Sequence, residues 1–461
     1  MTHFRIISSK QSRNGGSGAI NFLREAFLPV GYPDSVSADY TVYQAFDSLQ
    51  AFCSNLSGVL AARAAFRRAG VGDASATATA ATLTWIMQDG TGMIGRILYA
   101  WRVSFLLDAD CKQWRFYADI LNDSALSIEV LSPVLLPKSW FAFAACLSTL
   151  LKSLCGVTGG ATKAALSQHF AIRDNMADLH AKEGSQETVV GLVGMILGSS
   201  LMYMIPDDST LATLMAFVVF TSLHLICNYE GIRAVVMPSL NTQRAFLVLR
   251  AYMEEETNLK DDASIVTPRS ILSPAQVSRI ECIFWKLDYY SGSLWTRTSG
   301  FMVHPPKIEL GSSLDRVLDA WGGKDAVSEK SWQELRQSFS NGLSQQRTRI
   351  AHFLAISSSV SGHHTILVAL QQNATQTEIL LAYYHSLLLQ YRVVQMIGHT
   401  GHKNDLLDSE WCRSMVKRSC SEFSQTYESL LEGLDHNGWE LDSVHQSRIY
   451  IHSSCRFALD E

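Results

Sequence analysis

The sequence predicts a mainly α-helical protein, in which a multi-helix, membrane-embedded N-terminal bundle is followed by a small α+β C-terminal domain. Two uncharged apolar runs predict the bundle: residues 188–205 form a run of 18 and residues 211–229 a run of 19. Each is close to the roughly 20 residues that cross the hydrocarbon core of a bilayer as a helix. After about residue 245 the chain turns polar and short strand-like segments appear, which indicates a separate mixed domain.

Length and charge divide the chain. Its 461 residues exceed what one compact core usually supports. Residues 1–245 hold 18 basic and 18 acidic side chains, whereas residues 246–461 hold 20 and 25, so that only the second part carries a net charge, of −5. Neither part has the dense basic face that nucleic-acid binding needs, and no nucleic-acid partner is expected. The predicted order is a disordered tail at residues 1–26, a helical membrane domain at 27–245, a linker region at 246–345 and a small cytosolic α+β domain at 346–461.

The amino terminus and the cysteines give information about the cellular compartment of the protein. Before Glu25 the chain has basic residues but no acid, a faint likeness to an organelle transit peptide, and a short disordered tail is the favoured interpretation. No apolar stretch typical of a secretory signal follows, so membrane insertion is expected to use internal helices. Nine cysteines are scattered without a C-x-x-C pair, which favours reduced thiols facing a cytosol-like compartment over a disulfide framework.

Turn residues and apolar periodicity predict six or more helices before residue 245. The predicted helices cover residues 43–68, 74–88 with a continuation to 101 after a glycine-rich break, 112–131, 140–157, 162–182 and the two apolar runs. The two runs form a hairpin over residues 188–229 with a turn at 206–209. Gly194 and Gly198 have the G-x-x-x-G spacing that permits close helix contact; a flexible glycine-rich helix is the alternative.

The positions of basic residues predict how the hairpin is oriented. Five basic residues flank it: Lys163, Arg173 and Lys182 before the first run, and Arg233 and Arg244 after the second. The turn carries only the acids Asp207 and Asp208. Basic segments favour the cytoplasmic side of a membrane, so we expect the turn to lie away from the cytosol and the C-terminal domain to be cytosolic.

Strand and helix patterns predict the C-terminal domain. Strands are predicted at residues 352–357 and 365–370 around Ser361 and Gly362, helices at 377–397 and 410–434, and a last strand at 448–453. Residues 287–342 receive no assignment. The combination predicts an α+β sandwich.

Gly90, Gly92 and Gly95 form a G-x-G-x-x-G motif, the spacing of a dinucleotide-binding loop. That fingerprint needs a buried strand before it and a helix that begins within the glycines, whereas the preceding segment is rich in alanine and threonine. The competing interpretation is a helix break at which Asp89 and Arg96 pair at a membrane face, vaguely like the acid-to-arginine loop of major facilitator transporters.

Arg115, Asp119 and Asp123 lie four residues apart and share one face of a predicted helix. The two carboxylates repel each other unless a cation, a metal or a shared proton lies between them. A transporter or a proton-coupled site would use such a pair, because ionisable groups at membrane depth usually serve a function. The favoured alternative is an intrahelical salt bridge between Arg115 and Asp119 on a solvated face. The candidate functional polar residues are Asp89, Arg96, Asp119 and Asp123.

The remaining motifs predict no catalytic site, metal site or cofactor. Four histidines without a cysteine or carboxylate at ligand spacing are interpreted as surface residues: His363, His364, His399 and His402. Asp178 and Lys182 have the spacing of a helical ion pair. The sequence contains no nucleophile elbow, phosphate-binding loop, zinc-protease or kinase signature, so we do not expect an enzyme.

Short segments of distinctive sequence follow one another between residues 27 and 240. They are FLPVGYPDSV at 27–36, Trp85 with DGTGMIGR at 89–96, KQWR at 112–115, ADILND at 118–123, GGAT at 159–162, NMAD at 175–178 and AKEGSQET at 181–188. In this order they resemble the ROOT UVB SENSITIVE (RUS) family. The chain from Trp411 onward resembles the variable tail of family members more loosely.

The resemblance implies a limited set of expectations. The family domain was long described as of unknown function, and no catalytic residue carries over to this chain. Plant members are associated with plastids, ultraviolet-B tolerance in roots, auxin distribution and vitamin B6 homeostasis, and they are thought to act in partnership, so another RUS family member is an expected partner. Animal and fungal members are expected to be membrane proteins. The amino terminus is too short for a plastid peptide, so a plastid location is not expected.

Three hypotheses for function follow. The leading one is a multi-pass integral membrane protein whose partner is the lipid bilayer, in a transporter-like or scaffolding role. The second is a regulatory or binding protein in vitamin B6 homeostasis, in which Lys163 or Lys182 contacts the phosphate of a vitamer; it rests on the resemblance alone. The third is a soluble oxidoreductase that uses the motif at Gly90, which requires both apolar runs to be buried core helices. The sequence does not identify a small-molecule ligand.

Overall fold

The chain forms two compact units. The computed structural model describes residues 15–68, 78–206, 209–260, 271–284, 306–322, 329–343, 351–358, 364–400, 409–441 and 456–457. Unit 1 comprises Met1–Leu107 and Trp114–Val235, and unit 2 comprises Asp108–Gln113 and Val236–Glu461. Helices dominate the described residues and strands occur in unit 2, which confirms the predicted mainly α-helical chain with a small α+β C-terminal part.

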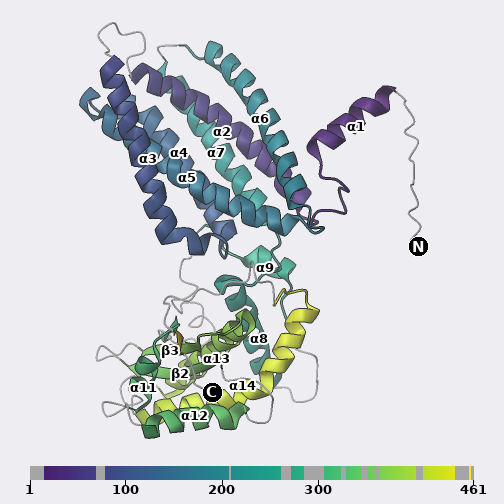
Figure 1. Ribbon diagram of the computed structural model, residues 1–461, viewed down its shortest axis with the longest axis vertical. Coiled ribbons are helices and arrows are strands. Elements are labelled where there is room, and N and C mark those ends of the chain that lie inside the picture. Colours follow the sequence, from purple (N-terminus) through teal and green to yellow (C-terminus); the bar gives the residue numbers. More distant parts are fainter. Residues whose placement is uncertain are drawn as a thin grey trace, which may run out of the picture. The chain divides into compact units, whose positions relative to one another are not determined.

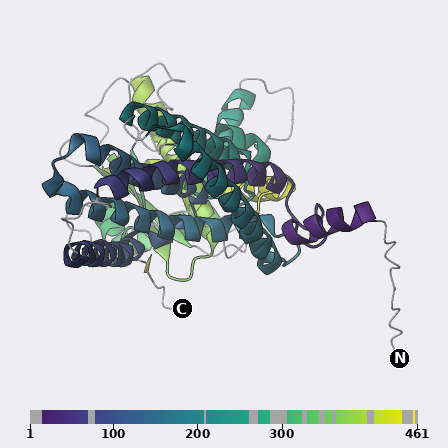
Figure 2. The same ribbon diagram turned by 90° about the horizontal axis from the view of Figure 1, so that it is seen from above.

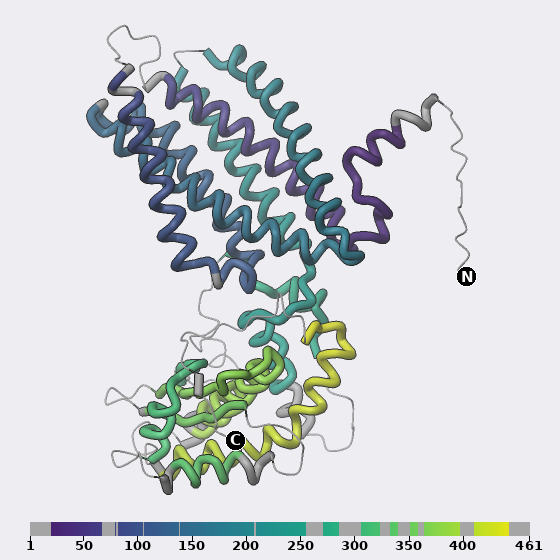
Figure 3. Tube along the Cα trace, in the orientation of Figure 1, coloured from purple at the N-terminus to yellow at the C-terminus, as the bar shows by residue number. Residues whose placement is uncertain are grey.

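Unit 1 is a bundle of long helices that lie side by side, as Figure 1 and Figure 3 show. Its helices are α1 (Gly15–Phe27), α2 (Tyr40–Arg68), α3 (Ala78–Leu107), α4 (Cys111–Leu135, whose first three residues belong to unit 2), α5 (Phe141–Phe170), α6 (Met176–Met204) and α7 (Thr210–Ala234). Helix α2 packs along both α6 and α7, and α3 packs along α5. Helix α1 projects from the side of the bundle and touches α6 (Figure 2).

Several helices of unit 1 differ in length from the predicted ones. Helix α3 is unbroken through residues 89–96, so the predicted helix break is wrong. Helix α4 continues past Pro133, and the helix predicted at residues 162–182 is divided between α5 and α6. Packing against neighbouring helices outweighs the cost of about 1 kcal/mol for each glycine inside a helix, which explains why the glycine-rich segment stays helical.

The two apolar runs form α6 and α7, as the hairpin prediction requires. Helix α7 begins after Ser209, whose hydroxyl oxygen accepts a hydrogen bond of 3.3 Å from the backbone nitrogen of Ala212 and so caps the helix. The turn acids Asp207 and Asp208 lie outside the described residues. Helix α1 covers residues 15–26 of the stretch for which composition predicts a disordered tail, residues 1–26, and ends one residue beyond it at Phe27.

Glycines allow α6 to approach α2 closely. A Cβ atom placed on Gly194 would lie 2.8 Å from the Cβ of Asn55, and one on Gly198 would lie 2.9 Å from Cγ2 of Val59. Both distances are shorter than real Cβ contacts. The G-x-x-x-G spacing therefore marks a helix contact, and the close packing predicted from it is confirmed.

Unit 2 contains a four-stranded sheet covered by helices. Its elements are α8 (Thr242–Lys260), α9 (Pro274–Ile280), β1 (Lys307–Leu310), α11 (Leu314–Gly322), α12 (Glu329–Leu343), β2 (His352–Ser358), β3 (His364–Gln371), α13 (Gln376–Thr400), α14 (Ser409–His436) and β4 (Arg456–Phe457). The central strand β3 pairs in parallel with β1 and β4 and antiparallel with β2. Helices α11, α13 and α14 pack on these strands. Both faces are covered, so β3 is buried along most of its length.

These elements confirm the two central strands and the two long helices predicted after residue 350. The strand predicted at residues 448–453 lies outside the described residues, and β4 follows it at Arg456–Phe457. The stretch predicted as a linker, residues 246–345, holds most of α8 together with α9, β1, α11 and α12. Residues 287–342, which the sequence left unassigned, include the parallel strand β1.

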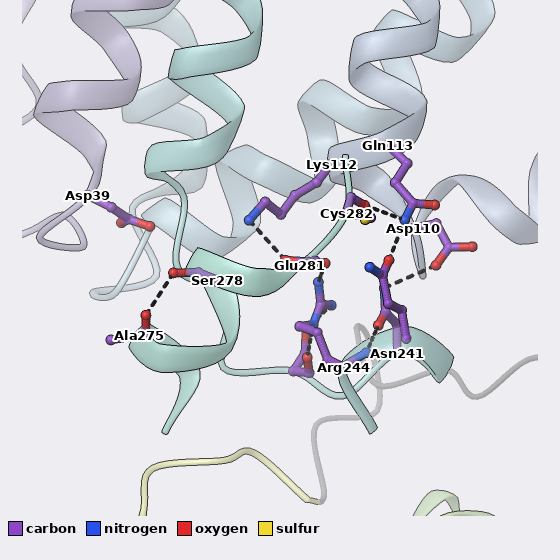
Figure 4. A network of polar contacts seen from close by, with 12 residues as sticks. Asp39, Asp110, Lys112, Gln113, Asn241, Arg244, Ala275, Ser278, Glu281 and Cys282 are labelled. Carbon is purple, nitrogen blue, oxygen red and sulfur yellow. Dashed lines mark hydrogen bonds and ion pairs between the residues drawn. The ribbon is translucent and has the colours of Figure 1, made fainter. Parts of the chain in front are cut away.

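A buried ion-pair network holds residues 108–113 in unit 2 (Figure 4). Nζ of Lys112, whose side chain is 1% exposed, lies 3.0 Å from Oε2 of Glu281, and Nη1 of Arg244 lies 2.8 Å from Oε1 of the same carboxylate. Burial acts to raise the pKa of Glu281, but Arg244 and Lys112 outweigh it, and the pKa is lowered. Nδ2 of Asn241 donates to the backbone oxygen of Ala109 over 3.1 Å. The network fixes the start of α4 to the start of α8 and to the residue that follows α9.

A pair of histidines lies in the core of unit 2. Nε2 of His352 lies 3.0 Å from Nδ1 of His385, whose other ring nitrogen is 3.0 Å from Oγ of Ser419. The ring of His385 stacks on Phe423 with 4.7 Å between centroids. Burial lowers the pKa of His352 to about 4, and burial together with the neighbouring His352 lowers that of His385. Both imidazoles are therefore neutral near neutral pH.

The contact at Gly194 predicts a specific cost of adding a methyl group. We expect Gly194→Ala to lower the free energy of unfolding by about 1–3 kcal/mol, because Cβ of Asn55 is fixed to the backbone of α2 and cannot rotate away. Gly191→Ala on the same helix is the matched control, since no atom lies within 4 Å of its added Cβ. The thermal unfolding midpoint of the purified protein measures both. Equal midpoints for the two variants would contradict the contact.

The histidine pair predicts an acid-sensitive unit 2. Below pH 6.5, the ordinary pKa of histidine, the side chain binds a proton in the unfolded chain but stays neutral when it is buried in the folded one. The unfolded state therefore binds more protons, and the free energy of unfolding decreases as the pH falls. For His352 the loss is about 2 kcal/mol between about pH 7 and about pH 5. We expect the protection factors of amides in β2 and α13, which correct for the slower intrinsic exchange at lower pH, to fall roughly 30-fold over this range. A His352→Phe/His385→Phe double variant should flatten the dependence, whereas the exposed control His436→Asn should retain it.

Candidate functional site

The outer faces of three helices in unit 1 are apolar. Exposed large apolar side chains include Leu83, Ile86, Ile94, Ile97 and Leu98 on α3, Leu192, Met195 and Ile196 on α6, and Leu211, Met215, Val218 and Val219 on α7. Helices α5, α6 and α7 are each long and apolar enough to cross a membrane, so α5 joins the two predicted spans. Such continuous apolar surface is unusual for a soluble monomer and is what helices facing lipid present.

The interior of the same bundle is polar. An ion pair joins two of its helices: Nη2 of Arg115 on α4 lies 3.0 Å from Oδ1 of Asp47 on α2. The hydroxyl of Tyr43 donates to that carboxylate oxygen over 3.4 Å. The side chain of Arg115 is 13% exposed and that of Asp47 9%. The attraction is therefore little screened by water, and each charge depends on the other for compensation.

Asp119 lies one helical turn beyond Arg115 and connects three helices. Its Oδ2 accepts a hydrogen bond of 2.7 Å from Nε2 of Gln50 on α2 and another from Nδ2 of Asn228 on α7. Asp119 is buried. Two amide donors replace the water that a carboxylate loses on burial, so this acid is held in place without a direct cation contact.

Asp123 follows one further turn along α4 and contacts a histidine. Its Oδ2 lies 2.8 Å from Nδ1 of His224 on α7. Asp123 is 5% exposed and His224 1%. Because a carboxylate only accepts hydrogen bonds, Nδ1 of His224 carries the hydrogen in this contact. The α4–α7 contact thus includes two matched polar pairs, Asp119 with Asn228 and Asp123 with His224, as expected for antiparallel helices with residues four apart.

Three polar atoms of this network have no hydrogen-bond partner among the described residues. They are Oδ1 of Asp123, Oδ1 of Asn228 and Nε of Arg115. Unsatisfied buried atoms are costly and usually indicate a ligand, a water molecule or an ion. We call seven residues the interior polar network: Asp47, Gln50, Arg115, Asp119, Asp123, His224 and Asn228.

The structure brings two of the four predicted polar residues together and separates the other two from them. Asp119 and Asp123 both belong to the interior polar network. Asp89 and Arg96 lie on α3, Arg96 is exposed, and no ion pair joins them among the described residues. The pairing predicted for Asp89 and Arg96 at a helix break is therefore absent from the described structure.

The favoured alternative for Asp119 is also corrected. Its face of α4 is buried, not solvated, and the ion-pair partner of Arg115 is Asp47 on another helix rather than Asp119. Partners on α2 and α7 turn that face inward. Periodicity within α4 shows that Arg115 and Asp119 share a face, but it does not show which surface the face meets.

Sequence reasoning missed the partners on α2 and α7. A signal was present: Asp47, Gln50 and Ser54 recur at helical spacing on α2. His224 and Asn228 are four residues apart in an otherwise apolar run. Polar residues on one face of such a run are a sign of a functional interior in membrane proteins.

The glycine motif contacts a helix and is itself flanked on both sides by helix α3, which runs from Ala78 to Leu107. Gly92 and Gly95 lie in the middle of α3 and face α5; a Cβ on Gly92 would lie 2.5 Å from Oγ of Ser153, and Leu150 fills the space beside Gly95. A dinucleotide fingerprint requires a strand before the glycines and a helix that starts at them. The structure places neither there, so the motif gives no support to an oxidoreductase.

The basic residues considered for phosphate binding have other contacts. Lys163 forms an ion pair with Glu187, and Lys182 donates to the backbone oxygen of Glu25. Asp178, the predicted partner of Lys182, instead accepts a hydrogen bond of 2.7 Å from the backbone nitrogen of Val30. These contacts fasten α6 to α5, to α1 and to the segment after α1.

The described part of the chain contains no group of three or more histidine, cysteine or acidic residues arranged to hold a metal ion. Of the four predicted surface histidines, His364 is half-buried at the start of β3. The side chains of His363, His399 and His402 lie outside the described residues.

Two family models match the chain. Residues 14–256 match the vitamin B6 photo-protection and homoeostasis domain, and residues 304–447 match the C-terminal region of root UVB sensitive proteins. Both the helical unit and the α+β unit thus contain sequence that matches models of one class of proteins. The chain belongs to the root UVB sensitive (RUS) family.

Relatives of similar sequence support this assignment. The chain is 47% identical over 272 residues to RUS family member 1 of Dictyostelium discoideum, a match that covers 59% of this chain and 49% of that protein. It is 34% identical over 388 residues to protein root UVB sensitive 3 of Arabidopsis thaliana, which covers 83% of this chain and 78% of the relative. Protein root UVB sensitive 5 of the same plant is 26% identical over 454 residues, 94% of this chain and 77% of the relative. No solved structure matches the chain significantly.

The buried ion pair predicts a large difference between two arginine substitutions. We expect Arg115→Gln to lower the free energy of unfolding by roughly 3–5 kcal/mol, because it leaves the carboxylate of Asp47 buried without a cation. Arg233→Gln removes an arginine from an exposed pair with Glu230 and should cost less than about 1 kcal/mol. The yield of folded protein on size-exclusion chromatography and the thermal midpoint report the difference. Similar losses in both variants would refute the role of Arg115.

Proposed function

We propose that this chain is a multi-pass integral membrane protein whose helical unit has a transporter-like role for a polar solute. The observation that carries the proposal is the inverted polarity of unit 1. Apolar side chains of α3, α6 and α7 face outward, whereas the charged residues of the interior polar network are buried between α2, α4 and α7. Charged groups inside a lipid-facing bundle are costly and commonly line the path of a solute or ion.

The helix hairpin supports an orientation for the bundle. Basic residues flank the apolar runs of α6 and α7, and the turn between the two helices carries acids. In our proposal the turn lies away from the cytosol and the C-terminal unit lies in the cytosol, in agreement with the positive-inside rule.

The family assignment supports a solute class. The matching domain is described by its role in vitamin B6 photo-protection and homoeostasis, and B6 vitamers are small, polar and often charged. We therefore include in the proposal that the solute is a B6 vitamer. Lys163 and Lys182 give this solute little support, because both are engaged in contacts within unit 1.

Alkaline carbonate extraction tests the membrane assignment directly. Membranes from cells that express the tagged full chain are extracted, and protease cleavage sites are introduced at residues 207–208 and at the carboxy terminus. We expect the protein in the pellet, a protected turn and a digestible C-terminal unit, because apolar spans resist extraction. Release into the supernatant would contradict the membrane assignment. A digestible turn together with a protected C-terminal unit would show that the orientation is the opposite of the proposed one.

A further inference from the structure

The interior polar network carries more negative than positive charge. It contains three carboxylates, of Asp47, Asp119 and Asp123, and one guanidinium, of Arg115, so that with a neutral His224 its formal charge is −2. The titratable groups that interact electrostatically with it from the packed helices include Tyr43 on α2, Cys155 on α5 and Glu183 on α6. Being acids, none of these three groups supplies a positive charge. An excess of buried negative charge is unfavourable and favours uptake of a cation.

Geometry places the excess at the α4–α7 contact. Asp47 is neutralised by Arg115, and Asp119 is held by two amide donors. Asp123 is different. Its Oδ2 contacts His224, whereas its Oδ1 is buried and has no hydrogen-bond donor among the described residues. The residue as a whole is 5% exposed. Oδ1 of Asn228, on the neighbouring turn of α7, is a second acceptor without a donor. Two orphaned acceptors indicate a missing donor.

We propose that Asp123 and His224 form a proton-binding pair at the centre of the bundle. The incoming ligand is a proton from water, which binds to the imidazole of His224 or to Oδ1 of Asp123 and changes the formal charge of the network from −2 to −1. No bond other than the new N–H or O–H forms. An imidazole is the side chain whose ordinary titration falls in the physiological range, and a carboxylate on its other nitrogen stabilises its protonated form.

Proton binding at this pair couples the protonation state of the network to the packing of α4 against α7. A proton on His224 converts the Asp123–His224 contact into an ion pair, and a proton on Asp123 neutralises its carboxylate, while loss of the proton leaves an uncompensated carboxylate between α4 and α7. The two helices therefore have a different preferred contact in each protonation state. This inference rests on the proposed transporter-like function, in which a proton gradient would drive or gate movement of the solute.

Infrared difference spectroscopy of the purified full chain between about pH 8 and about pH 5 tests the pair. We expect the wild type to show either a protonated carboxyl band or an imidazolium ring band that grows as the pH falls. The band that belongs to the pair should be absent from both Asp123→Asn and His224→Gln, whereas the other titrating histidines and carboxylates of the chain contribute alike to all spectra. Glu129→Gln is the matched control, since Glu129 lies on the same helix but pairs with the half-exposed Lys152, and it should retain the change. Identical difference spectra for wild type and Asp123→Asn would overturn the proposal.

Two further measurements keep the test decisive. If Asp123→Asn fails to fold, Asp123→Glu retains an acid and should retain the spectral change at a displaced midpoint; its complete loss in a folded Asp123→Glu would count against the pair. Replacing choline by Na⁺ at constant ionic strength should leave the change unaltered, and its suppression by Na⁺ would assign the site to sodium instead. If the protein stays in the pellet after carbonate extraction but shows no spectral change of the pair, the proton-binding proposal alone is overturned. If carbonate releases the protein into the supernatant, the proposed function is overturned.

Discussion

The ion pair between Arg115 and Asp47 is the constraint on which the interior of unit 1 depends. Both charges are buried, so α2 and α4 can separate only at the cost of exposing an uncompensated charge to an apolar surrounding. The same rotation of α4 that directs Arg115 inward also directs Asp119 and Asp123 inward, because the three lie on one helical face. Their contacts with α7 then follow, and the polar interior is a consequence of one helix orientation.

Close helix contact makes this interior compact. Gly194 and Gly198 let α6 approach α2, and Gly92 and Gly95 let α3 approach α5. With small residues at the contacts, the large apolar side chains of α3 and α6 face outward instead of filling the core. A lipid environment accommodates that arrangement, since van der Waals packing of small residues and interhelical polar contacts, not apolar burial, hold helices together in a bilayer. In unit 2 the reverse holds, and apolar strands and helices surround a neutral histidine pair.

Much of the fold could be predicted from the sequence. The hairpin of α6 and α7 and the elements β2, β3, α13 and α14 follow from apolar runs, alternation and turn residues, which act locally. The glycine-rich segment of α3 and the length of α4 were mispredicted for one reason: local breakers were outweighed by packing against α5 and other distant helices. Of the candidate site, Asp119 and Asp123 were identified because their spacing is visible within one helix, whereas their partners are 69–109 residues away.

The sequence by itself determined the class of the protein: a helical unit with apolar spans, an α+β unit after it, and membership in the RUS family. These depend on the order and spacing of residues along the chain. The tertiary structure alone decided which helix faces meet. It showed that Arg115 pairs with Asp47, that His224 contacts Asp123 and that the glycine motif of α3 serves packing. Periodicity defines a face within a helix, but the partner of that face is set by contacts between distant segments, which no local pattern encodes.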